Sequence, residues 1–275
     1  MNWNCVWAIA SKDMKAVSSN SKLWIPLLVL PILFCVVFPV GLILAAPHAA
    51  GSDTLELIRS MTANLPQRGV ISEISAMQVP GHQLIYLAVH YLLLPVFLII
   101  PLITSMVTST NSFVGEKERR TLESLLFSPI SILELFTGKV LASLIPTLVI
   151  SASGFAALGV VVDTMTYSTF GKLIFPSANW LILACWLAPA LTFCNILFCV
   201  LISARVKGYQ EAQQICGVTI LPVVGLVIGQ ITGLFLLSPF LLIIIGGILL
   251  AMSLFLLQRI SAMNGRHVLF EKQIH

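Results

Sequence analysis

Charge is what this sequence has least of. Only 9% of its 275 residues are charged and 58% are hydrophobic, whereas a soluble domain carries about 25% charged residues. This composition excludes a soluble protein, and it leaves little chain for a separate soluble domain beside membrane helices of roughly 20 residues each. The net charge of only +4 lends no support to a nucleic-acid partner. We expect an all-α, polytopic protein embedded in membrane lipid.

The chain also lacks the patterns of a catalyst. No stretch matches Gly-x-x-x-x-Gly-Lys-Ser/Thr, the loop that cradles nucleotide phosphates. We therefore expect no cofactor or metal on this chain and no enzymatic activity of its own. The long apolar runs contain no Asp or Glu, the residues through which ion-driven transporters usually relay charge. If the protein moves a substrate uphill, the energy has to enter from outside the membrane.

Six stretches without charged residues are long enough to cross a bilayer. A central charge costs about 2.5 to 3.5 kcal/mol on the insertion scale, while each Leu or Ile returns only about 0.3 to 0.6. The last charge-free run, from Ala212 to Gln258, is roughly twice the length that one helix needs; Gly233 and the Ser238-Pro239 pair indicate a turn that divides it. The predicted transmembrane helices are 23–46, 83–110, 140–162, 177–204, 214–235 and 240–258.

Lysine and arginine are distributed unevenly between alternate loops. Twelve fall on the side that holds both termini, and three, Arg59, Arg68 and Lys172, fall on the other side. Cytoplasmic loops carry the excess of positive charge, so we predict that both termini are cytoplasmic and that the protein resides in the cell membrane. The long connection at 47–82 is then an outer loop, and 111–139 is a cytoplasmic loop.

Residues 1–22, before the first span, show a helical periodicity of apolar side chains. The apolar positions recur at spacings of three and four, while Lys12 and Lys15 lie away from them. This pattern predicts an amphipathic helix in the inner membrane interface. Its apolar face consists of Trp3, Val6, Trp7, Ala10, Met14 and Val17.

Glycine recurs at every fourth residue in the fifth predicted span, at Gly225, Gly229 and Gly233. This spacing clears a groove along one helix face and lets another backbone approach closely. It predicts helix packing, either within the subunit or across a dimer, and the pattern does not distinguish the two.

The connection between the second and third spans is the most strongly patterned loop. Glu116 precedes Arg120 by four residues, the favourable order for an ion pair on a helix. Pro129 ends this predicted helix, and Ser131 with Glu134 forms a capping box that starts the next one. An amphipathic helix of this kind either lies on the membrane or docks a cytoplasmic partner. Its apolar face consists of Leu122, Leu125 and Leu126.

The same loop resembles that of a known family. ABC-2 type permeases, the membrane subunits of ATP-binding-cassette exporters, have an inner-loop signature similar to residues 116–129, Glu-Lys-Glu-Arg-Arg-Thr-Leu-Glu-Ser-Leu-Leu-Phe-Ser-Pro, followed by Glu134 and Gly138-Lys139. Residues 207–214 resemble the second inner loop of the sodium-extruding branch of that family. With six spans and an N-terminal interfacial helix, the resemblance covers nearly the whole chain.

The resemblance implies a division of labour between chains. The protein would be a single transmembrane domain, residues 1–275, paired with a second permease copy in a homodimer or heterodimer. Two copies of an ATP-binding subunit would carry ATP and Mg²⁺ and dock on the inner loops. Arg120 is a departure, since many members have glycine there. The implied coupling residues are Glu116, Lys117, Glu118, Arg119, Arg120, Thr121, Leu122, Glu123, Leu125, Leu126, Pro129, Lys207, Glu211 and Gln213.

Two other function classes stay open from the sequence. One is an energy-independent channel or secondary transporter, and the other is a membrane immunity or assembly factor that translocates nothing. No pattern specifies the substrate: apolar spans suit lipids, drugs or hydrophobic peptides, and an ion or a polysaccharide is also compatible.

Overall fold

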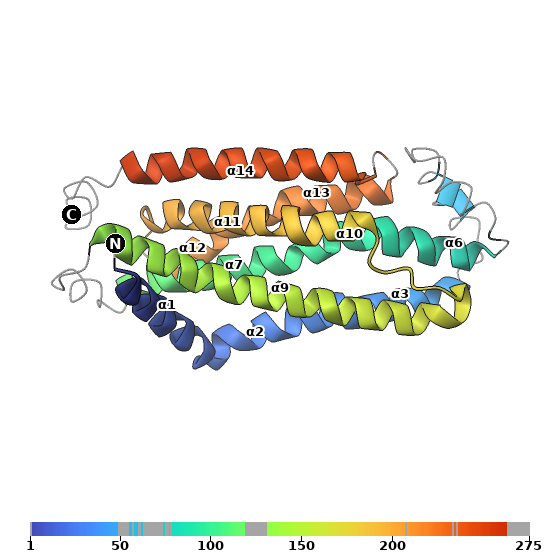
Figure 1. Ribbon diagram of the computed structural model, residues 1–275, viewed down its shortest axis with the longest axis horizontal. Coiled ribbons are helices and arrows are strands. Elements are labelled where there is room, and N and C mark those ends of the chain that lie inside the picture. The colour runs from blue at the N-terminus through green and yellow to red at the C-terminus, as the bar shows by residue number, and fades with distance from the viewer. Residues whose placement is uncertain are drawn as a thin grey trace.

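Helices along one common axis make up the structure. The computed structural model describes residues 2–48, 55–56, 58–59, 62, 74, 77, 79–118, 131–206, 208–232, 234 and 236–262. Every regular element in this described part is helical, which confirms the expected all-α class. The long helices lie nearly parallel, and α1 is inclined against the bundle close to the N-terminus (Figure 1).

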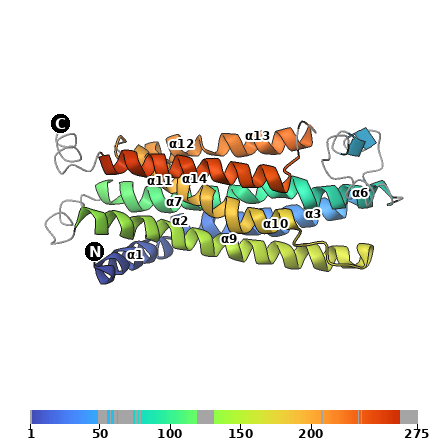
Figure 2. The ribbon, with the colours of Figure 1, turned by 45° about the horizontal axis from the view of Figure 1, so that its top comes forward.

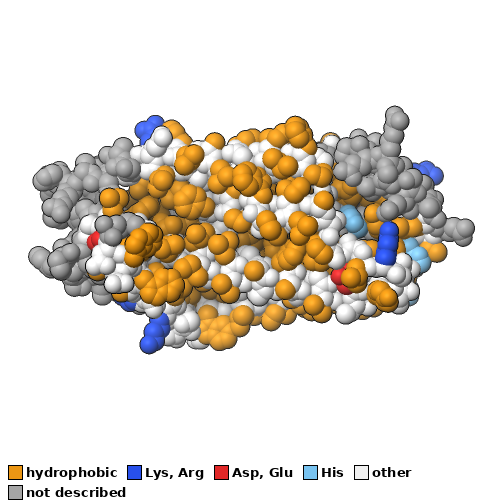
Figure 3. Space-filling model, viewed as in Figure 1, with side chains coloured by type: hydrophobic (Ala, Val, Ile, Leu, Met, Phe, Trp, Pro, Cys, Tyr) orange, Lys and Arg blue, Asp and Glu red, His pale blue; other side chains and the backbone are white. Residues whose placement is uncertain are grey.

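Six of the helical stretches are long and apolar enough to cross a membrane, which confirms the expected number of spans. The face shown in Figure 3 is predominantly hydrophobic over its middle, and its Lys, Arg, Asp and Glu side chains lie toward the two ends. This distribution is typical of a membrane protein, because a charged side chain in the hydrocarbon core of a bilayer costs free energy. The six candidate spans are Leu23–His48, Pro80–Gly115, Leu133–Phe170, Ala178–Ser203, Tyr209–Ile231 and Pro239–Ile260.

Several spans are built from more than one helical segment. In chain order the elements are α1 (Trp3–Ser18), α2 (Ser21–Ile32), the π-helical turn η1 (Leu33–Val37), α3 (Phe38–Ala45), the 3-10 turn η2 (Ala46–His48), α6 (Pro80–Leu87), the π-helical turn η3 (Ala88–Leu92), α7 (Leu93–Glu118), α9 (Ile132–Phe170), α10 (Ala178–Ile182), the π-helical turn η4 (Leu183–Leu187), α11 (Ala188–Ser203), α12 (Tyr209–Gly217), α13 (Ile220–Ile231) and α14 (Pro239–Ala262).

Two of the helices extend beyond the stretches predicted to cross the membrane. Because α7 continues through Glu118 and α9 begins at Ile132, both ends of the predicted 111–139 loop are helical. The 39 residues of α9 measure about 58 Å at 1.5 Å per residue, nearly twice the roughly 30 Å hydrocarbon thickness. Its charged Lys139 and Asp163 lie about 36 Å apart along the helix axis. The helix is therefore long enough to protrude from the membrane at both ends.

Each of the three π-helical turns comes just before a proline. Pro39 follows η1, Pro95 follows η3 and Pro189 follows η4. Proline has no N–H, and its ring clashes with the carbonyl four residues earlier. A wider turn at this place relieves the clash and lets the helix continue. In a bilayer the freed carbonyls need other donors.

The carbonyls of η3 find such donors on neighbouring helices. Trp180 in α10 is fully buried and donates its indole N–H to the Val89 carbonyl at 2.8 Å. The amide of Gln230 in α13, in the orientation that satisfies both of its ends, donates to the Tyr91 carbonyl at 2.9 Å and accepts the Leu237 N–H at 3.2 Å. Tyr91 lies four residues before the proline that follows η3, so its carbonyl lacks the N–H that an α-helix would supply from that position. These bonds tie three spans together.

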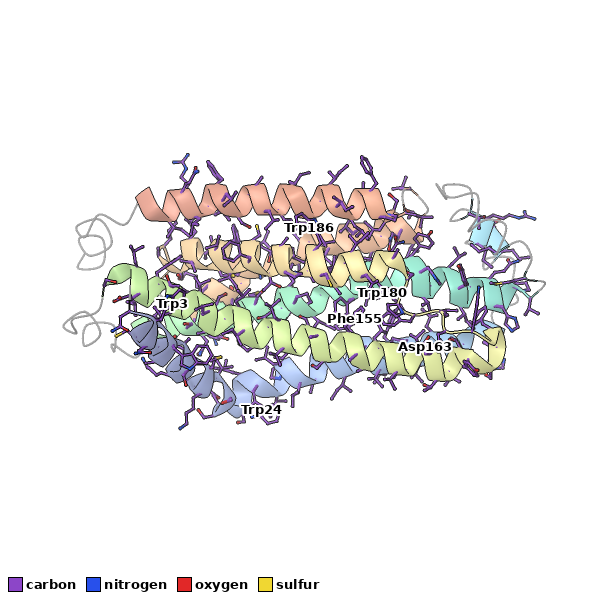
Figure 4. All side chains as sticks on the ribbon, in the orientation of Figure 1. Trp3, Trp24, Phe155, Asp163, Trp180 and Trp186 are labelled. Atoms are coloured by element: carbon purple, nitrogen blue, oxygen red, sulfur yellow. The ribbon has the colours of Figure 1, made fainter. Side chains whose placement is uncertain are left out.

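Aromatic rings fill the interior beside η3. Asp163 supports this region from α9, where its Oδ1 accepts the N–H groups of Ile174 at 3.2 Å and Phe175 at 3.1 Å. It thereby holds the segment after α9 against the bundle (Figure 4). Centroid separations within the cluster are 4.9 to 6.1 Å, the range that aromatic pairs favour. The cluster comprises Phe97, Phe155, Phe175 and Trp180.

Candidate functional site

Four chain segments come together at the end of the bundle that holds the N-terminus, here named the amino-terminal end. They are α1, the last turns of α7, the first turns of α9 and the connection between α11 and α12 (Figure 1). Within this group α1 packs chiefly against α9, and α12 packs against α7. Figure 2 shows α1 lying along the first part of α9. Both loops in which the sequence places the coupling residues start from this end.

The first turn of α9 is closed by the predicted capping box, which the structure confirms. The Ser131 hydroxyl accepts the Glu134 N–H at 3.2 Å, and Glu134 Oε2 accepts the Ser131 N–H at 3.1 Å. The other carboxylate oxygen of Glu134 accepts the backbone N–H of Asn2 at 2.5 Å. One side chain therefore caps α9 and also binds the residue that precedes α1.

One turn further along α9, the backbones of α9 and α1 come into close approach at Gly138. A Cβ atom at this position would lie 2.9 Å from Ile9 Cβ and 3.0 Å from the Val6 carbonyl oxygen. Such distances are shorter than real Cβ contacts, so any larger residue would push the two helices apart. Glycine at this position lets α1 seat directly on α9.

Lys139, the next residue of α9, binds the middle of α1 through a buried ion pair. Its Nζ lies 3.4 Å from Asp13 Oδ2, and the two side chains are only 4% and 6% exposed. Asp13 Oδ2 also accepts the Ser112 hydroxyl at 2.5 Å, and Lys139 donates to the Ser112 carbonyl. Lys139 Nζ lies 5.5 Å from the centroid of the Phe113 ring. Buried charges persist when they are paired and hydrogen-bonded in this way. The cluster joins α1, α7 and α9.

Sequence reasoning missed Asp13, and it treated Lys139 as one of the inner-side positive charges and as part of the resemblance, without a partner. A signal was present, because Asp13 follows Ile9 by four residues and precedes Val17 by four, and all three lie on the buried face of α1. An acidic residue on the apolar face of a helix calls for a buried basic partner. The sequence alone does not say which of the fifteen Lys and Arg residues supplies it.

The apolar face predicted for residues 1–22 is divided in the structure. Val6, Ala10 and Val17 are buried against the protein, whereas Trp3 and Trp7 are 63% and 57% exposed. The buried face of α1 is rotated relative to the predicted apolar face, so the two tryptophans at the edge of the predicted face lie outside the contact with the bundle. The two exposed tryptophans stay available for the membrane interface, and that role of α1 stays a prediction.

The stems of the two predicted contact loops pack against each other. Val114 in α7 is fully buried and forms one cluster with Val206 and Ala212, which flank the connection between α11 and α12. Tyr209, from the first turn of α12, packs on the same cluster. Because Val114 lies two residues before Glu116, the two loops leave the bundle side by side.

Most of the predicted coupling residues lie outside the described side chains. The backbone of α7 includes Glu116, Lys117 and Glu118, although the structure does not describe their side chains. Glu211 is exposed in the first turn of α12, and Gln213, two residues later, is half-buried. Entirely outside the described residues lie Arg119, Arg120, Thr121, Leu122, Glu123, Leu125, Leu126, Pro129 and Lys207.

The glycines of the fifth span lie in different environments. A Cβ atom on Gly225 would meet no atom within 4 Å, and this residue is exposed. Gly229 is buried beside Gln230, and Gly233 lies outside the described residues. The close approach within the subunit is therefore absent at Gly225. For this position the alternative of a contact across a dimer stays open.

The polar groups of the amino-terminal end join helices to one another. Among the residues that the structure describes, no three His, Cys, Asp or Glu side chains group closely enough to hold a metal ion. The polar groups of the amino-terminal end instead bind one helix to another, as Asp13, Lys139 and Glu134 do. Contacts of this kind make the joined helices move together.

Comparison with known proteins identifies the family. The model of the ABC-2 family transporter protein matches residues 7–257, a range that begins within α1 and reaches into all six candidate spans. No curated protein matches the sequence. Since the match covers nearly the whole chain, the protein belongs to the ABC-2 transporter family and is a multi-pass membrane permease subunit of an ABC transporter.

Proposed function

We propose that this chain is the permease of an ATP-driven exporter, and that two copies of a separate ATP-binding-cassette ATPase drive it from the amino-terminal end. ATP and Mg²⁺ bind to the ATPase, while the chain supplies the path through the membrane. The family supports the association with an ATP-binding subunit. The outward direction and the two copies follow from the resemblance of residues 116–129 to the exporter signature. The uneven distribution of Lys and Arg supports cytoplasmic termini in the cell membrane.

One observation carries this docking proposal, namely the packing of Val114 against Val206 and Ala212. The packing brings the beginning of the 116–126 segment beside the connection that contains Lys207. A single ATPase surface that touches one of the loops is therefore within reach of the other. Two loops so far apart in sequence would otherwise present independent sites.

Polar contacts connect this docking end to the interior of the bundle. Asn195 in α11 donates to the Leu102 carbonyl at 3.0 Å and to the Ser105 hydroxyl at 2.8 Å, both in α7. The Thr108 hydroxyl of α7 lies 3.4 Å from the Ser143 carbonyl of α9. Force applied to the 116–126 segment would reach α7, α9 and α11 together. The spans would then tilt as a group and alternate access to the substrate path.

A second permease copy would pack on the outward face of α13. Gly225 is open on this face, and Leu221 and Ile228, four residues before and three after it, are 66% and 55% exposed. A small residue between large apolar side chains allows a close contact between membrane helices. The same surface serves a homodimer or a heterodimer.

The docking site is tested by replacing Leu122 and Leu125 together with Asp. Charge on the predicted apolar face should release the ATPase, so that it no longer co-purifies with the permease, while membrane insertion persists because the segment lies between spans. Leu55→Asp is the control, since Leu55 is 41% exposed and lies at the opposite end of the bundle. Undiminished co-purification of the ATPase with the double variant would contradict the proposal.

A further inference from the structure

The buried ion pair of the amino-terminal end lies where three helices meet. Asp13 comes from α1, Lys139 from α9 and Ser112 from α7, and both charged residues are at most 5% exposed. The carboxylate binds the lysine and the serine hydroxyl, and the lysine binds the serine carbonyl. Removing any one of the three residues would leave a buried polar group short of a partner.

Two further contacts keep α1 on the same part of α9. The Asn2 N–H donates to Glu134 at 2.5 Å, and Gly138 admits the backbone of α1 beside Ile9. Contacts thus follow one another along α1 from Asn2 to Asp13, all with the first two turns of α9. Through Ser112 the same cluster also contacts α7. It therefore joins α1 to both α7 and α9, the two helices that residues 119–131 connect.

The ion pair differs in kind from the apolar contacts around it. Apolar side chains can slide past one another with little change in buried area, whereas a hydrogen-bonded charge pair inside a protein tolerates little displacement. A buried ion pair adds little net stability compared with apolar residues of similar size. The contribution of this pair is therefore to fix the relative position of two helices. It fixes where α1 stands relative to α9.

We infer that Asp13 and Lys139 are positioning residues that make α1 and the first turns of α9 move as one body when the ATPase acts on the loop between α7 and α9. The inference rests on the proposed function. It assigns to α1 a part in the transport cycle: this helix carries the exposed Trp3 and Trp7, and it would move with α9 at each ATPase stroke.

The test uses the complete complex of permease and ATPase in lipid nanodiscs, with and without ATP and vanadate. Cysteines at Ser11 and Val149, both exposed, carry spin labels that report the distance between α1 and α9. A second pair at Tyr167 and Phe240, 58% and 72% exposed, reports movement of the spans. Cys5 and Cys185, the two cysteines that are not buried, are replaced by serine.

The decisive variant is Asp13→Leu with Lys139→Met, which removes both charges and leaves no unpaired one. Lys12→Met is the matched control, because Lys12 is 55% exposed and its Nζ lies 3.9 Å from the same carboxylate. Thermal unfolding and co-purification of the ATPase are measured for each variant. They show whether the complex is folded and assembled before the distances are compared.

In the wild type and the control, the distance between α1 and α9 should be the same with and without ATP and vanadate. In the double variant it should shift or broaden with nucleotide, and the nucleotide-dependent change between Tyr167 and Phe240 should fall by at least half. A double variant whose two label pairs behave as in the wild type would overturn the inference. Absence of a bound ATPase, or of any nucleotide-dependent change in the wild type, would instead refute the proposed function.

Discussion

Lys139 Nζ lies 3.4 Å from Asp13 Oδ2 although the two residues are 126 positions apart in the sequence. Both side chains are buried, so neither charge has water to replace its partner. A substitution of either residue alone should therefore weaken the packing of α1 on α9.

Lys139→Met should destabilise the protein strongly, because it leaves the Asp13 carboxylate buried without its cation. We expect a loss of about 3 to 5 kcal/mol, measured as the shift in thermal unfolding in detergent. Lys12→Met removes an exposed cation from the same carboxylate and should cost at most about 1 kcal/mol. Equal effects of the two substitutions would show that the buried pair has no special role.

Gly138→Ala should weaken the seating of α1 on α9, since the added Cβ would lie 2.9 Å from Ile9 Cβ. Overpacking of this kind costs about 1 to 3 kcal/mol, and α1 should become more accessible to protease. Gly247→Ala is the control, because a Cβ there meets nothing within 4 Å; in a helix it should be neutral or stabilising by up to about 1 kcal/mol. If α1 is equally protected in both variants, the close approach at Gly138 is not needed.

Trp180→Phe should destabilise the bundle by leaving the Val89 carbonyl without its donor. An unsatisfied buried carbonyl costs about 1 to 3 kcal/mol, a cost that rises where no water reaches it. Trp186→Phe removes a similar indole bond, to the Ile243 carbonyl at 3.2 Å, from a side chain that is 41% exposed. Thermal unfolding should show the larger shift for Trp180→Phe, and the reverse order would contradict the assigned role of this bond.

Gly225→Leu should reduce dimer formation without changing the fold of the subunit, because a Cβ atom at this position meets none of the described atoms within 4 Å. Light scattering of the detergent-solubilised permease measures the dimer fraction. Gly247→Leu adds the same bulk at an equally open position on α14 and should leave the dimer intact. A dimer that tolerates leucine at Gly225 would place the interface elsewhere.

The permease reconstituted alone should conduct nothing. The six stretches predicted to cross the membrane contain no charged residue, so they lack the relay that ion-driven transport uses. Liposome flux assays with K⁺, Na⁺ and a hydrophobic fluorescent dye should match empty liposomes when no ATPase is present. Flux independent of nucleotide would favour the channel or secondary transporter, and a complex that moves nothing under any condition would favour the immunity or assembly factor.

Sequence reasoning succeeded where a property belongs to one short stretch of chain. Six spans follow from charge-free length, because the energy of insertion is a sum over the residues of each segment. The capping box of Ser131 and Glu134 is equally local, since its two hydrogen bonds join residues three apart.

Only the tertiary structure decided which faces meet. The periodicity of residues 1–22 predicted a helix, but the rotation of that helix against α9 determined that Val6 is buried and Trp3 exposed. Gly138 and Gly225 are both glycines in helices, and packing alone makes one a close contact and leaves the other open. The pairing of Asp13 with Lys139 was likewise decided only by the tertiary structure. A contact between segments so far apart in the sequence depends on how the helices are placed, and no local sequence pattern specifies that placement.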